Sequence, residues 1–426
     1  MRLRAMCWTR WCRVVVVTIV VVGTMTASAD VFRILDDPSE AMQARVDIIQ
    51  QAEQEVHALY FLVRNDRVTL GALALLREAR GRGVGSVRLI VDANFSHIPK
   101  AVLAHLRDEG VQVRVYHPLT LRHPTWVFRR MHEKVVVVDR ARYITGGRNL
   151  AEAYFGLAKK NYVDRDVYVE GDSAADADAH FEALWNSRHV RYLHVRVSDA
   201  EKRAAAERLT TALQELESAG LIALNTGRNW SEGEKDAGVV RFVHDPLPSV
   251  DGPRVATTFM EILESAQAEI VIESPYLVPT KALLQLFERK LAQGVRVTVL
   301  TNSLRSCDGV LPQAGYLKYR RRLLRSGIDL REYRGPDMLH AKTAVVDGRV
   351  VIVGSYNLDP RSQNLNTEAV CIAEDDEIAR EVLASIDEHL ANAWTVGKAR
   401  GPRISRSLTF RAWAARLLLP WIENQL

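Results

Sequence analysis

The sequence contains few cysteines. Of its four, Cys7 and Cys12 precede an apolar run near the N-terminus, which leaves Cys307 and Cys371 in the body of the chain. Neither the spacing nor the context of these two indicates a disulfide. We therefore expect two unrelated thiols.

Acidic residues are absent before Asp30. Residues 2–13 are basic, residues 14–22 form a β-branched apolar stretch, and Ala27-Ser28-Ala29 has the small-x-small pattern that signal peptidase accepts. The apolar stretch is shorter than the ~20 residues that a membrane-spanning helix needs. We predict a signal peptide at residues 1–29, with an uncleaved N-terminal anchor as the alternative. Either reading predicts an exported body, associated with the membrane at its periplasmic face.

Low-complexity sequence is also absent, and so are basic stripes rich in aromatics outside the C-terminus. The formal net charge is +5, but much of this excess lies in the N-terminal segment, so the body is nearly neutral. Nucleic acid is therefore disfavoured as a partner. A chain of 426 residues can bury a substantial core, and its length favours two domains or one duplicated domain.

The two halves of the chain repeat one order of elements. Apolar spacing predicts helices at 44–52, 71–80, 259–266 and 281–291, and buried strands at 56–63, 87–91, 270–276 and 294–300. Strands that alternate with helices predict an α/β fold with a largely parallel central sheet. We place a first lobe at 30–195, a connector at 196–238 and a second lobe at 239–400. Residues 401–426 are basic and amphipathic, which fits either a membrane interface or a docked helix.

The strongest signal is a pair of His-x-Lys motifs in the same frame. His132 and Lys134 are followed by Asp139 and Gly146-Gly147-Arg148-Asn149, and His340 and Lys342 are followed by Asp347 and Gly354-Ser355-Tyr356-Asn357. A lone motif of this kind is usually ordinary strand surface. Two copies with equal spacing to Asp and Asn indicate a functional site instead.

The spacing predicts a surface for a phosphate group. Residues i and i+2 of a strand share a face, so each motif presents an imidazole beside an ammonium. Asn149 and Asn357 can donate amide hydrogens, while the turns at Gly147 and Ser355 let backbone N–H groups approach closely. We take these four as candidate substrate-binding residues. Asp139 and Asp347 complete the candidate catalytic motifs, but their odd spacing from the histidines predicts that they support the turns.

Two facing histidines supply what phosphodiester exchange requires. One imidazole acts as nucleophile and the other as the general acid that protonates the leaving alkoxide, and the symmetry of the motifs leaves either assignment open. Each imidazole needs an acceptor that orients its second nitrogen. Asp166 and Glu368 are the candidates, each about thirty residues beyond its own histidine. An ordinary surface carboxylate is the alternative interpretation of both.

The paired motifs resemble the phospholipase D superfamily, and their flanks resemble its bacterial cardiolipin synthases, particularly the C-type branch. The similarity covers about residues 32–426 and includes Tyr154-Phe155-Gly156, Trp185-Asn186-Ser187, Ser274-Pro275-Tyr276, Thr301-Asn302-Ser303-Leu304 and Leu358-Asp359-Pro360-Arg361-Ser362. It implies two α/β/α lobes related by a pseudo-twofold axis, with one active site at their interface. It also implies a phosphatidyl-histidine intermediate on His132, no metal and no other cofactor. Gly147 stands where that pattern has Ser.

The resemblance favours a phosphatidyltransferase that makes cardiolipin from phosphatidylglycerol, with phosphatidylglycerol or phosphatidylethanolamine as the second lipid. The expected partner is an anionic phospholipid membrane, and no protein partner is predicted. Water as acceptor would instead give a phospholipase, and nucleic acid in the groove would give a nuclease. A noncatalytic module that binds anionic headgroups is a third class, which the intact histidines, lysines and asparagines disfavour.

Overall fold

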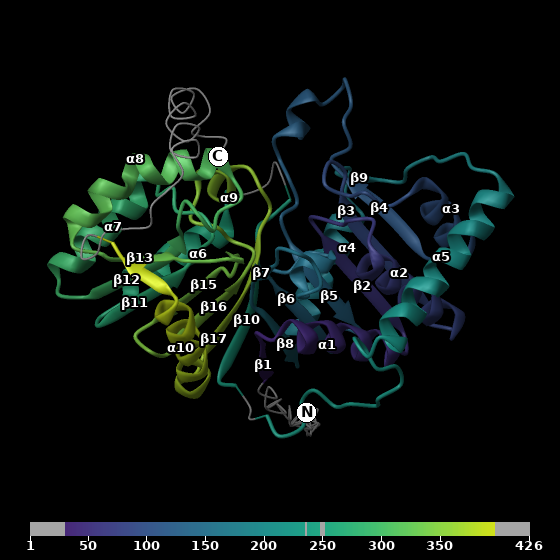
Figure 1. Ribbon diagram of the computed structural model, residues 1–426, viewed down its shortest axis with the longest axis horizontal. Helices are drawn as coiled ribbons and strands as arrows, with labels where there is room; N and C mark the ends of the chain where they lie inside the picture. Colours follow the sequence, from purple (N-terminus) through teal and green to yellow (C-terminus); the bar gives the residue numbers. More distant parts are fainter. Residues whose placement is uncertain (1–29, 235–236, 248–251, 397–426) are drawn as a thin grey trace, which may run out of the picture.

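Two eight-stranded sheets, one from each half of the chain, form the centre of the molecule. The computed structural model describes residues 30–234, 237–247 and 252–396, so the predicted signal segment 1–29 and the C-terminal segment 401–426 lie outside the described residues. Figure 1 shows the two lobes side by side, the first in purple and blue, the second in green and yellow.

The first half of the chain contains the first lobe and the helix that follows it. Its strands are β1 (Val31–Leu35), β2 (Glu55–Tyr60), β3 (Ser86–Asp92), β4 (Gln112–Tyr116), β5 (Lys134–Val138), β6 (Arg142–Gly146), β7 (Tyr162–Val163), β8 (Asp166–Glu170) and β9 (Val190–Arg191). Its helices are α1 (Pro38–Gln50), α2 (Arg67–Gly81), α3 (Lys100–Asp108), η1 (Pro124–Val127), η2 (Glu152–Tyr154), α4 (Ser173–Trp185) and α5 (Asp199–Ser218).

The second lobe repeats the order of the sheet strands, while its short strand β14 (Met338–Leu339) precedes its His-x-Lys motif and β7 follows that of the first lobe. Its strands are β10 (Val239–His244), β11 (Glu269–Glu273), β12 (Arg296–Asn302), β13 (Asp329–Tyr333), β14 (Met338–Leu339), β15 (Thr343–Val346), β16 (Val350–Gly354), β17 (Ala369–Glu374) and β18 (Ala393–Thr395). Its helices are α6 (Arg254–Ser265), α7 (Lys281–Ala292), α8 (Val310–Ser326), α9 (Pro360–Asn364) and α10 (Asp376–Ala391).

Strand order shows the duplication directly. The first sheet runs β1-β8-β6-β5-β2-β3-β4-β9 and the second runs β10-β17-β16-β15-β11-β12-β13-β18, so each strand has a counterpart in the same place. The predicted helices and strands are present in both halves, with boundaries that differ by a few residues. The α/β class and the duplicated two-lobed architecture are therefore confirmed.

The prediction of a largely parallel sheet was wrong. In the first sheet only β2–β3 and β3–β4 pair in parallel, and the second sheet repeats this with β11–β12 and β12–β13. The remaining ladders, including the valine-rich hairpin β5–β6, are antiparallel. Tight turns explain the two hairpins β5–β6 and β15–β16, because Asp139 and Arg140 have φ of 53° and 54°, and Asp347 and Gly348 have φ of 53° and 62°. Two successive positive φ values form the tight turn that joins antiparallel strands.

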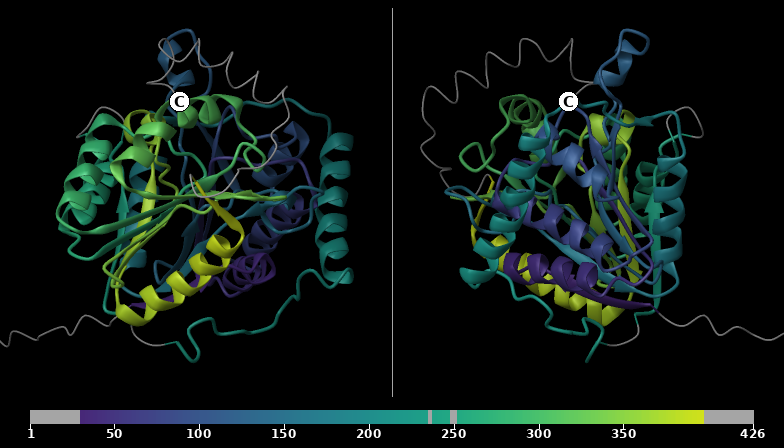
Figure 2. Two further views of the ribbon diagram at one scale, coloured as in Figure 1. Left: turned by 60° about the vertical axis from the view of Figure 1, so that its left-hand side comes forward. Right: turned by 90° about the vertical axis from the view of Figure 1, so that its right-hand side faces the viewer.

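Helices cover both faces of each sheet. One apolar core joins α1, α2 and α5 to the first sheet, another joins α6 and α7 to the second, and a third, between the lobes, contains α4, α10 and strands of both sheets. Helix α5, which lies in the predicted connector, begins with a capping box between Ser198 and Glu201 and packs on α2 and α3 (Figure 2). In the described part of the chain, no helix has both the length and the apolar character that a membrane crossing requires.

Candidate active site

The two histidine segments cross into the opposite lobe. The backbone N–H of His132 donates to the carbonyl of Thr367 (2.9 Å), and that of His340 donates to the carbonyl of Val163 (2.6 Å). A short parallel β-pairing holds each histidine segment against the other lobe: Met131 pairs with Thr367, and β14 pairs with β7. Because each crossing places a motif from one lobe against a loop from the other, both histidines lie at the lobe interface.

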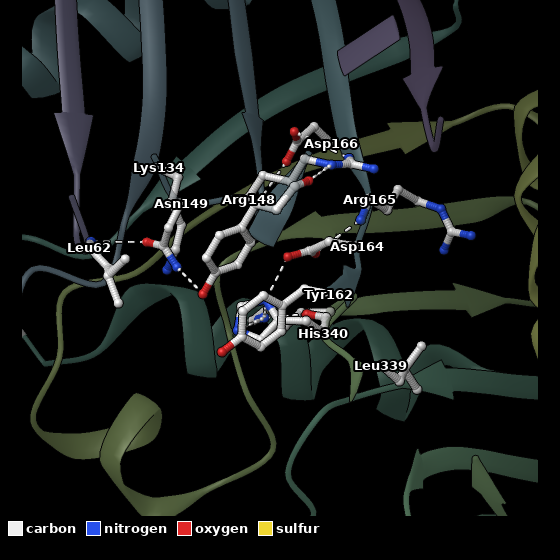
Figure 3. A network of polar contacts seen from close by, with 12 residues as sticks. Leu62, Lys134, Arg148, Asn149, Tyr162, Asp164, Arg165, Asp166, Leu339 and His340 are labelled. Atoms are coloured by element: carbon white, nitrogen blue, oxygen red, sulfur yellow. Dashed lines mark hydrogen bonds and ion pairs between the residues drawn. The ribbon is translucent and has the colours of Figure 1, made fainter. Parts of the chain in front are cut away.

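A buried carboxylate from the opposite lobe contacts each imidazole. Nδ1 of His132 lies 2.9 Å from Oε2 of Glu368, and Nδ1 of His340 lies 2.5 Å from Oδ2 of Asp164. Both carboxylate side chains have no exposed surface. Figure 3 shows Asp164 pointing at His340. Each histidine is therefore oriented across the interface, and a complete pair requires both lobes.

Asp166 does not orient a histidine, so that prediction was wrong. Its carboxylate instead binds the guanidinium of Arg45 (2.7 Å) and the backbone N–H of Arg148 (3.1 Å). Strand register gives the reason: Gly146 pairs with Asp166, and Gly354 pairs with Val370. The counterpart of Glu368 is therefore two residues before Asp166, at Asp164. Glu368 does orient an imidazole, but the histidine is that of the first lobe.

The two lysines lie beside the histidines and are buried. Nζ of Lys342 is 2.8 Å from Nδ1 of His340, and each ammonium donates to the backbone carbonyl of its own histidine. Burial, followed by the charge of Lys342, lowers the pKa of Lys134 to about 7, and burial lowers the pKa of Lys342 to about 8. The charge of Lys342 thus acts on Lys134 across the lobe interface, as expected if both motifs form one site.

In addition to burial, the lysine of the opposite motif lowers the pKa of each histidine. Burial, Lys134 and Lys342 lower the pKa of His132 well below its usual value. Burial and Lys342 also lower the pKa of His340, while Asp164 acts in the opposite direction. A bound phosphate would relieve this repulsion, because its negative charge would lie among these cationic groups.

The asparagines and turn residues lie close to this centre. Asn149 accepts from the backbone N–H of Leu62 (3.0 Å) and donates to the hydroxyl of Tyr154 (2.8 Å), so its amide group is fixed in orientation. Asn357 is buried, and its Oδ1 has no hydrogen-bond partner. The hydroxyl of Ser355 donates to Glu368, whereas Gly147 lies against Asp164.

The motif aspartates lie at the far ends of their strands. The carboxylate of Asp139 accepts from the backbone N–H groups of residues 53–55, and that of Asp347 accepts from those of residues 267–269. Each ties a hairpin turn to the segment that enters the neighbouring strand. The structure thus places them as supports of the fold and not among the groups around the histidines.

Several site residues were not found from the sequence. Phe61 packs edge-on against His132 (4.8 Å between centroids), and Tyr154 and Tyr162 pack against His340 (5.3 and 5.1 Å). Asp245 accepts from the backbone N–H of Glu368 (3.0 Å) and so supports the segment that carries this carboxylate. Tyr154 lies in a stretch that the family resemblance had marked, while Phe61 and Asp245 lie far along the chain from either motif.

One cluster in the described part of the chain has metal-ligand chemistry, formed by Glu55, His57 and Asp178. Arg140 lies 2.7 Å from Glu55 and 2.9 Å from Asp178, so a cation already occupies the position of a metal ion. Glu55 and His57 belong to β2, whereas His132 and His340 lie at the crossings between the lobes. This cluster therefore contributes nothing to the paired-histidine site.

The comparisons with known proteins identify the family. A family model described as "Cardiolipin synthase, PLD-like domain" matches residues 46–185 and 259–390, which include both motifs. The chain belongs to the phospholipase D superfamily, in its cardiolipin synthase-like family. It is 28% identical to cardiolipin synthase C of Escherichia coli K12, over 87% of each chain. It is 26% identical to a cardiolipin synthase of Staphylococcus aureus Mu50, over 91% of this chain and 73% of that protein.

A solved structure shows the same fold. Phosphatidylserine synthase of Haemophilus influenzae Rd KW20 superposes with a TM-score of 0.69 at 15% identity, covering 93% of this chain and 95% of that one. Family and relatives together support an enzyme of the phospholipid phosphatidyltransferase type.

Proposed function

We propose that this enzyme makes cardiolipin by transferring a phosphatidyl group to a glycerol hydroxyl of phosphatidylglycerol from a second lipid, phosphatidylglycerol or phosphatidylethanolamine, through a phosphatidyl-histidine intermediate. The observation that carries the proposal is the pair of buried histidines at one interface, each oriented by a carboxylate from the opposite lobe. One nucleophile and one proton donor on opposite sides of a phosphate suffice for double displacement.

The unequal carboxylates support His132 as the nucleophile. Burial favours a protonated Asp164, but His340 and Lys342 lower its pKa far below the usual value, so Asp164 stays ionised and stabilises an imidazolium on His340. Burial raises the pKa of Glu368 to about 7, although Lys134 opposes this shift. Because His132 lacks a fully ionised partner near neutral pH and its own pKa is lowered, its imidazole is neutral, as a nucleophile must be.

The reaction then follows from these roles. Nε2 of His132 attacks phosphorus while His340 gives its proton to the departing alcohol oxygen, so one P–N bond forms and one P–O bond breaks. His340 next takes the proton of an incoming lipid hydroxyl, whose oxygen attacks phosphorus and releases His132. Lys134, Lys342, Asn149 and Asn357 are the groups available to hold the nonbridging oxygens, where negative charge grows in the transition state.

The test is direct lipid analysis. Purified mature chain is incubated in vesicles with phosphatidylglycerol labelled in the phosphatidyl group, with and without phosphatidylethanolamine, and the products are separated. Labelled cardiolipin, absent with His132→Ala and His340→Ala, is the expected result. Labelled phosphatidic acid as the sole product would assign water as acceptor and make the enzyme a phospholipase. Cleavage of nucleic acid without lipid turnover would overturn the lipid assignment.

We also propose that the body is exported and acts at the periplasmic face of the membrane. The sequence of residues 1–29 supports this proposal, because it has a basic start, an apolar stretch and the small residues Ala27-Ser28-Ala29. Mass spectrometry of the exported protein is expected to find Asp30 at the N-terminus. Recovery of residues 1–29 on the membrane-bound protein would indicate the anchor instead, and an exclusively cytoplasmic protein would contradict export.

A further inference from the structure

We propose that the loop formed by residues 117–131 inserts its apolar tip into an anionic phospholipid bilayer and so holds the active site against its lipid substrates. The inference rests on the proposed function only for the nature of those substrates. The loop joins β4 to the segment of His132, and in Figure 1 it is the blue excursion that stands out from the molecule above the junction of the lobes. The turned views of Figure 2 show the same projection.

Exposed apolar side chains gather on this loop. Leu121 is 100% exposed, Leu119 is 75% exposed and Phe128 is 43% exposed. The other large apolar side chains that are exposed in the described part lie on the two residues after β9, on β10 and on α8: Tyr192, Leu193, Val239 and Leu311. Two nearly bare leucines in one short stretch are costly in water unless they meet an apolar partner.

The loop is internally packed, so its leucines are held outward. Trp126 is buried between the rings of His117 and His123, stacked at 4.4 and 4.3 Å. Arg130 is buried below and binds Asp92 (3.0 Å). These contacts fill the base of the loop and leave Leu119 and Leu121 no room in the core.

The base of the loop contacts the segments of both motifs. It runs directly into Met131 and His132, and its Phe128 carbonyl accepts from the guanidinium of Arg361 (3.1 Å) in α9. Helix α9 follows Asn357, the last residue of the second motif. A membrane bound at the tip would therefore be joined to both motif segments through the base of the loop.

Comparison of the two lobes shows that the loop is an addition. The first lobe inserts residues 117–131 between Tyr116 and His132, whereas the second lobe needs only residues 334–339 between Tyr333 and His340. The shorter connection builds the same sheet and the same crossing. The extra length is therefore not required by the fold, which leaves a role outside the lobe.

Charge favours an anionic lipid surface over a second copy of the chain or another protein. Arg122 and Arg129 are exposed beside the leucines, and no acidic residue occurs between Glu109 and Glu133. Apolar side chains that enter the acyl boundary, flanked by arginines at headgroup level, are the combination that binds anionic bilayers.

The experiment measures vesicle binding separately from catalysis. Full-length chain carrying His132→Ala is sedimented with vesicles of phosphatidylglycerol and phosphatidylethanolamine, with and without Leu119→Ser and Leu121→Ser together. We expect the double substitution to weaken partitioning by about tenfold or more, because two apolar anchors are lost. Val239→Ser, which removes a 55% exposed apolar side chain in β10, is the control and should leave binding unchanged.

Two further measurements keep the outcome clear. Arg122→Gln with Arg129→Gln should abolish the preference for vesicles that contain phosphatidylglycerol. In the chain with both catalytic histidines, the leucine substitutions should lower turnover of vesicle lipid but leave turnover of a water-dispersed short-chain phosphatidylglycerol intact. Unchanged partitioning of the leucine variant would overturn the proposal. If the leucine substitutions lowered the mass of the chain in solution but left its partitioning into vesicles unchanged, the loop would bind a second copy of the chain and not a membrane. If the parent bound vesicles through this loop but made no cardiolipin, the proposed reaction would be wrong and the proposed membrane contact would still hold.

Discussion

Asp164 reaches His340 because residue 147 is a glycine. A Cβ atom at Gly147 would lie 1.9 Å from Oδ1 of Asp164, a distance that no packing tolerates. At the matching place in the second lobe, the Ser355 hydroxyl donates to Glu368. The first lobe thus combines Gly147 with the shorter side chain of Asp164, where the second lobe combines Ser355 with the longer side chain of Glu368. The departure of Gly147 from the family pattern has a structural cause in the first lobe itself.

Gly147→Ser is therefore expected to displace the Asp164 carboxylate from His340. Because the imidazole loses the group that orients it, kcat should fall about a hundredfold or more. Steady-state kinetics with vesicle substrate measure the loss, and circular dichroism checks the fold. Ser355→Gly removes a hydroxyl without creating a clash and serves as the comparison, with a clearly smaller effect. Equal losses in the two variants would contradict this account.

Asp164→Asn should impair proton donation in particular. Removing the ionised neighbour of His340 lowers the pKa of this imidazole further, so the alkaline limb of the kcat/KM profile should shift to lower pH. A substrate whose leaving group departs without protonation should recover most of the lost rate. Measurement with a nitrophenyl phosphodiester and with phosphatidylglycerol gives the contrast. If both substrates lose equally, His340 is not the acid.

Glu368→Gln should show a different dependence on pH. The pKa of Glu368 is raised to about 7, so this carboxyl is protonated below that pH and ionised above it. Glutamine imitates the protonated form. The variant should therefore match the parent below about pH 6 and fall behind as pH rises through 7, where the parent gains a carboxylate behind His132. A ratio of the two rates that stays constant from pH 5 to 9 would contradict ionisation of Glu368 in this range.

Trapping of the intermediate should separate the two histidines. With an activated phosphodiester, His340→Ala should accumulate phosphatidyl-enzyme, because attack by His132 proceeds while transfer to the second alcohol stalls. His132→Ala should carry no label. Acid-labile phosphohistidine is mapped by peptide analysis. The reverse pattern exchanges the roles, and label in neither variant argues against the covalent route.

Arg165 should be a major contributor to stability at the lobe interface. Its buried guanidinium binds Glu273 of the second lobe (2.7 Å), Asp36 (2.7 Å) and the hydroxyl of Ser385 (2.6 Å). Arg165→Met removes the ion pair of the buried Glu273 carboxylate. It should therefore lower the free energy of unfolding, measured in urea, by about 3–5 kcal/mol. Arg140→Ala, whose side chain is 60% exposed, should cost less than about 1 kcal/mol. Glu273→Gln added to Arg165→Met should restore part of the loss.

The sequence was enough to find the duplication and the paired motifs because both rest on local spacing. The helices, the valine strands and the turns at Asp139 and Asp347 are determined by residues near to one another. The orienting acid was missed by two positions because its place depends on the register of β8 against β6, a long-range pairing that spacing from His132 does not reveal. The same limit applies to the sheet, since helices and strands alternate in both parallel and mixed arrangements.

Local sequence also could not predict that each carboxylate orients the histidine of the other lobe. Nothing near Glu368 in the chain indicates whether it will meet His340 or His132, because that choice is made by the crossing at Met131 and Thr367. The apolar loop before His132 lay outside the motifs, and only its exposure in the folded chain distinguishes its leucines from core residues.

The crossed histidine–carboxylate pairs also constrain how such a chain can arise. A single half with one histidine and one carboxylate could not form this hydrogen bond within itself, since each carboxylate contacts the histidine of the other half. Two identical halves would complete each other by isologous association, with two equal pairs on the axis. The crossed pairs are thus the arrangement that a symmetric dimer of such halves would have. In the present chain the halves are no longer equal, since the first lobe holds the Gly147–Asp164 pair and the projecting loop, and the second holds Ser355–Glu368.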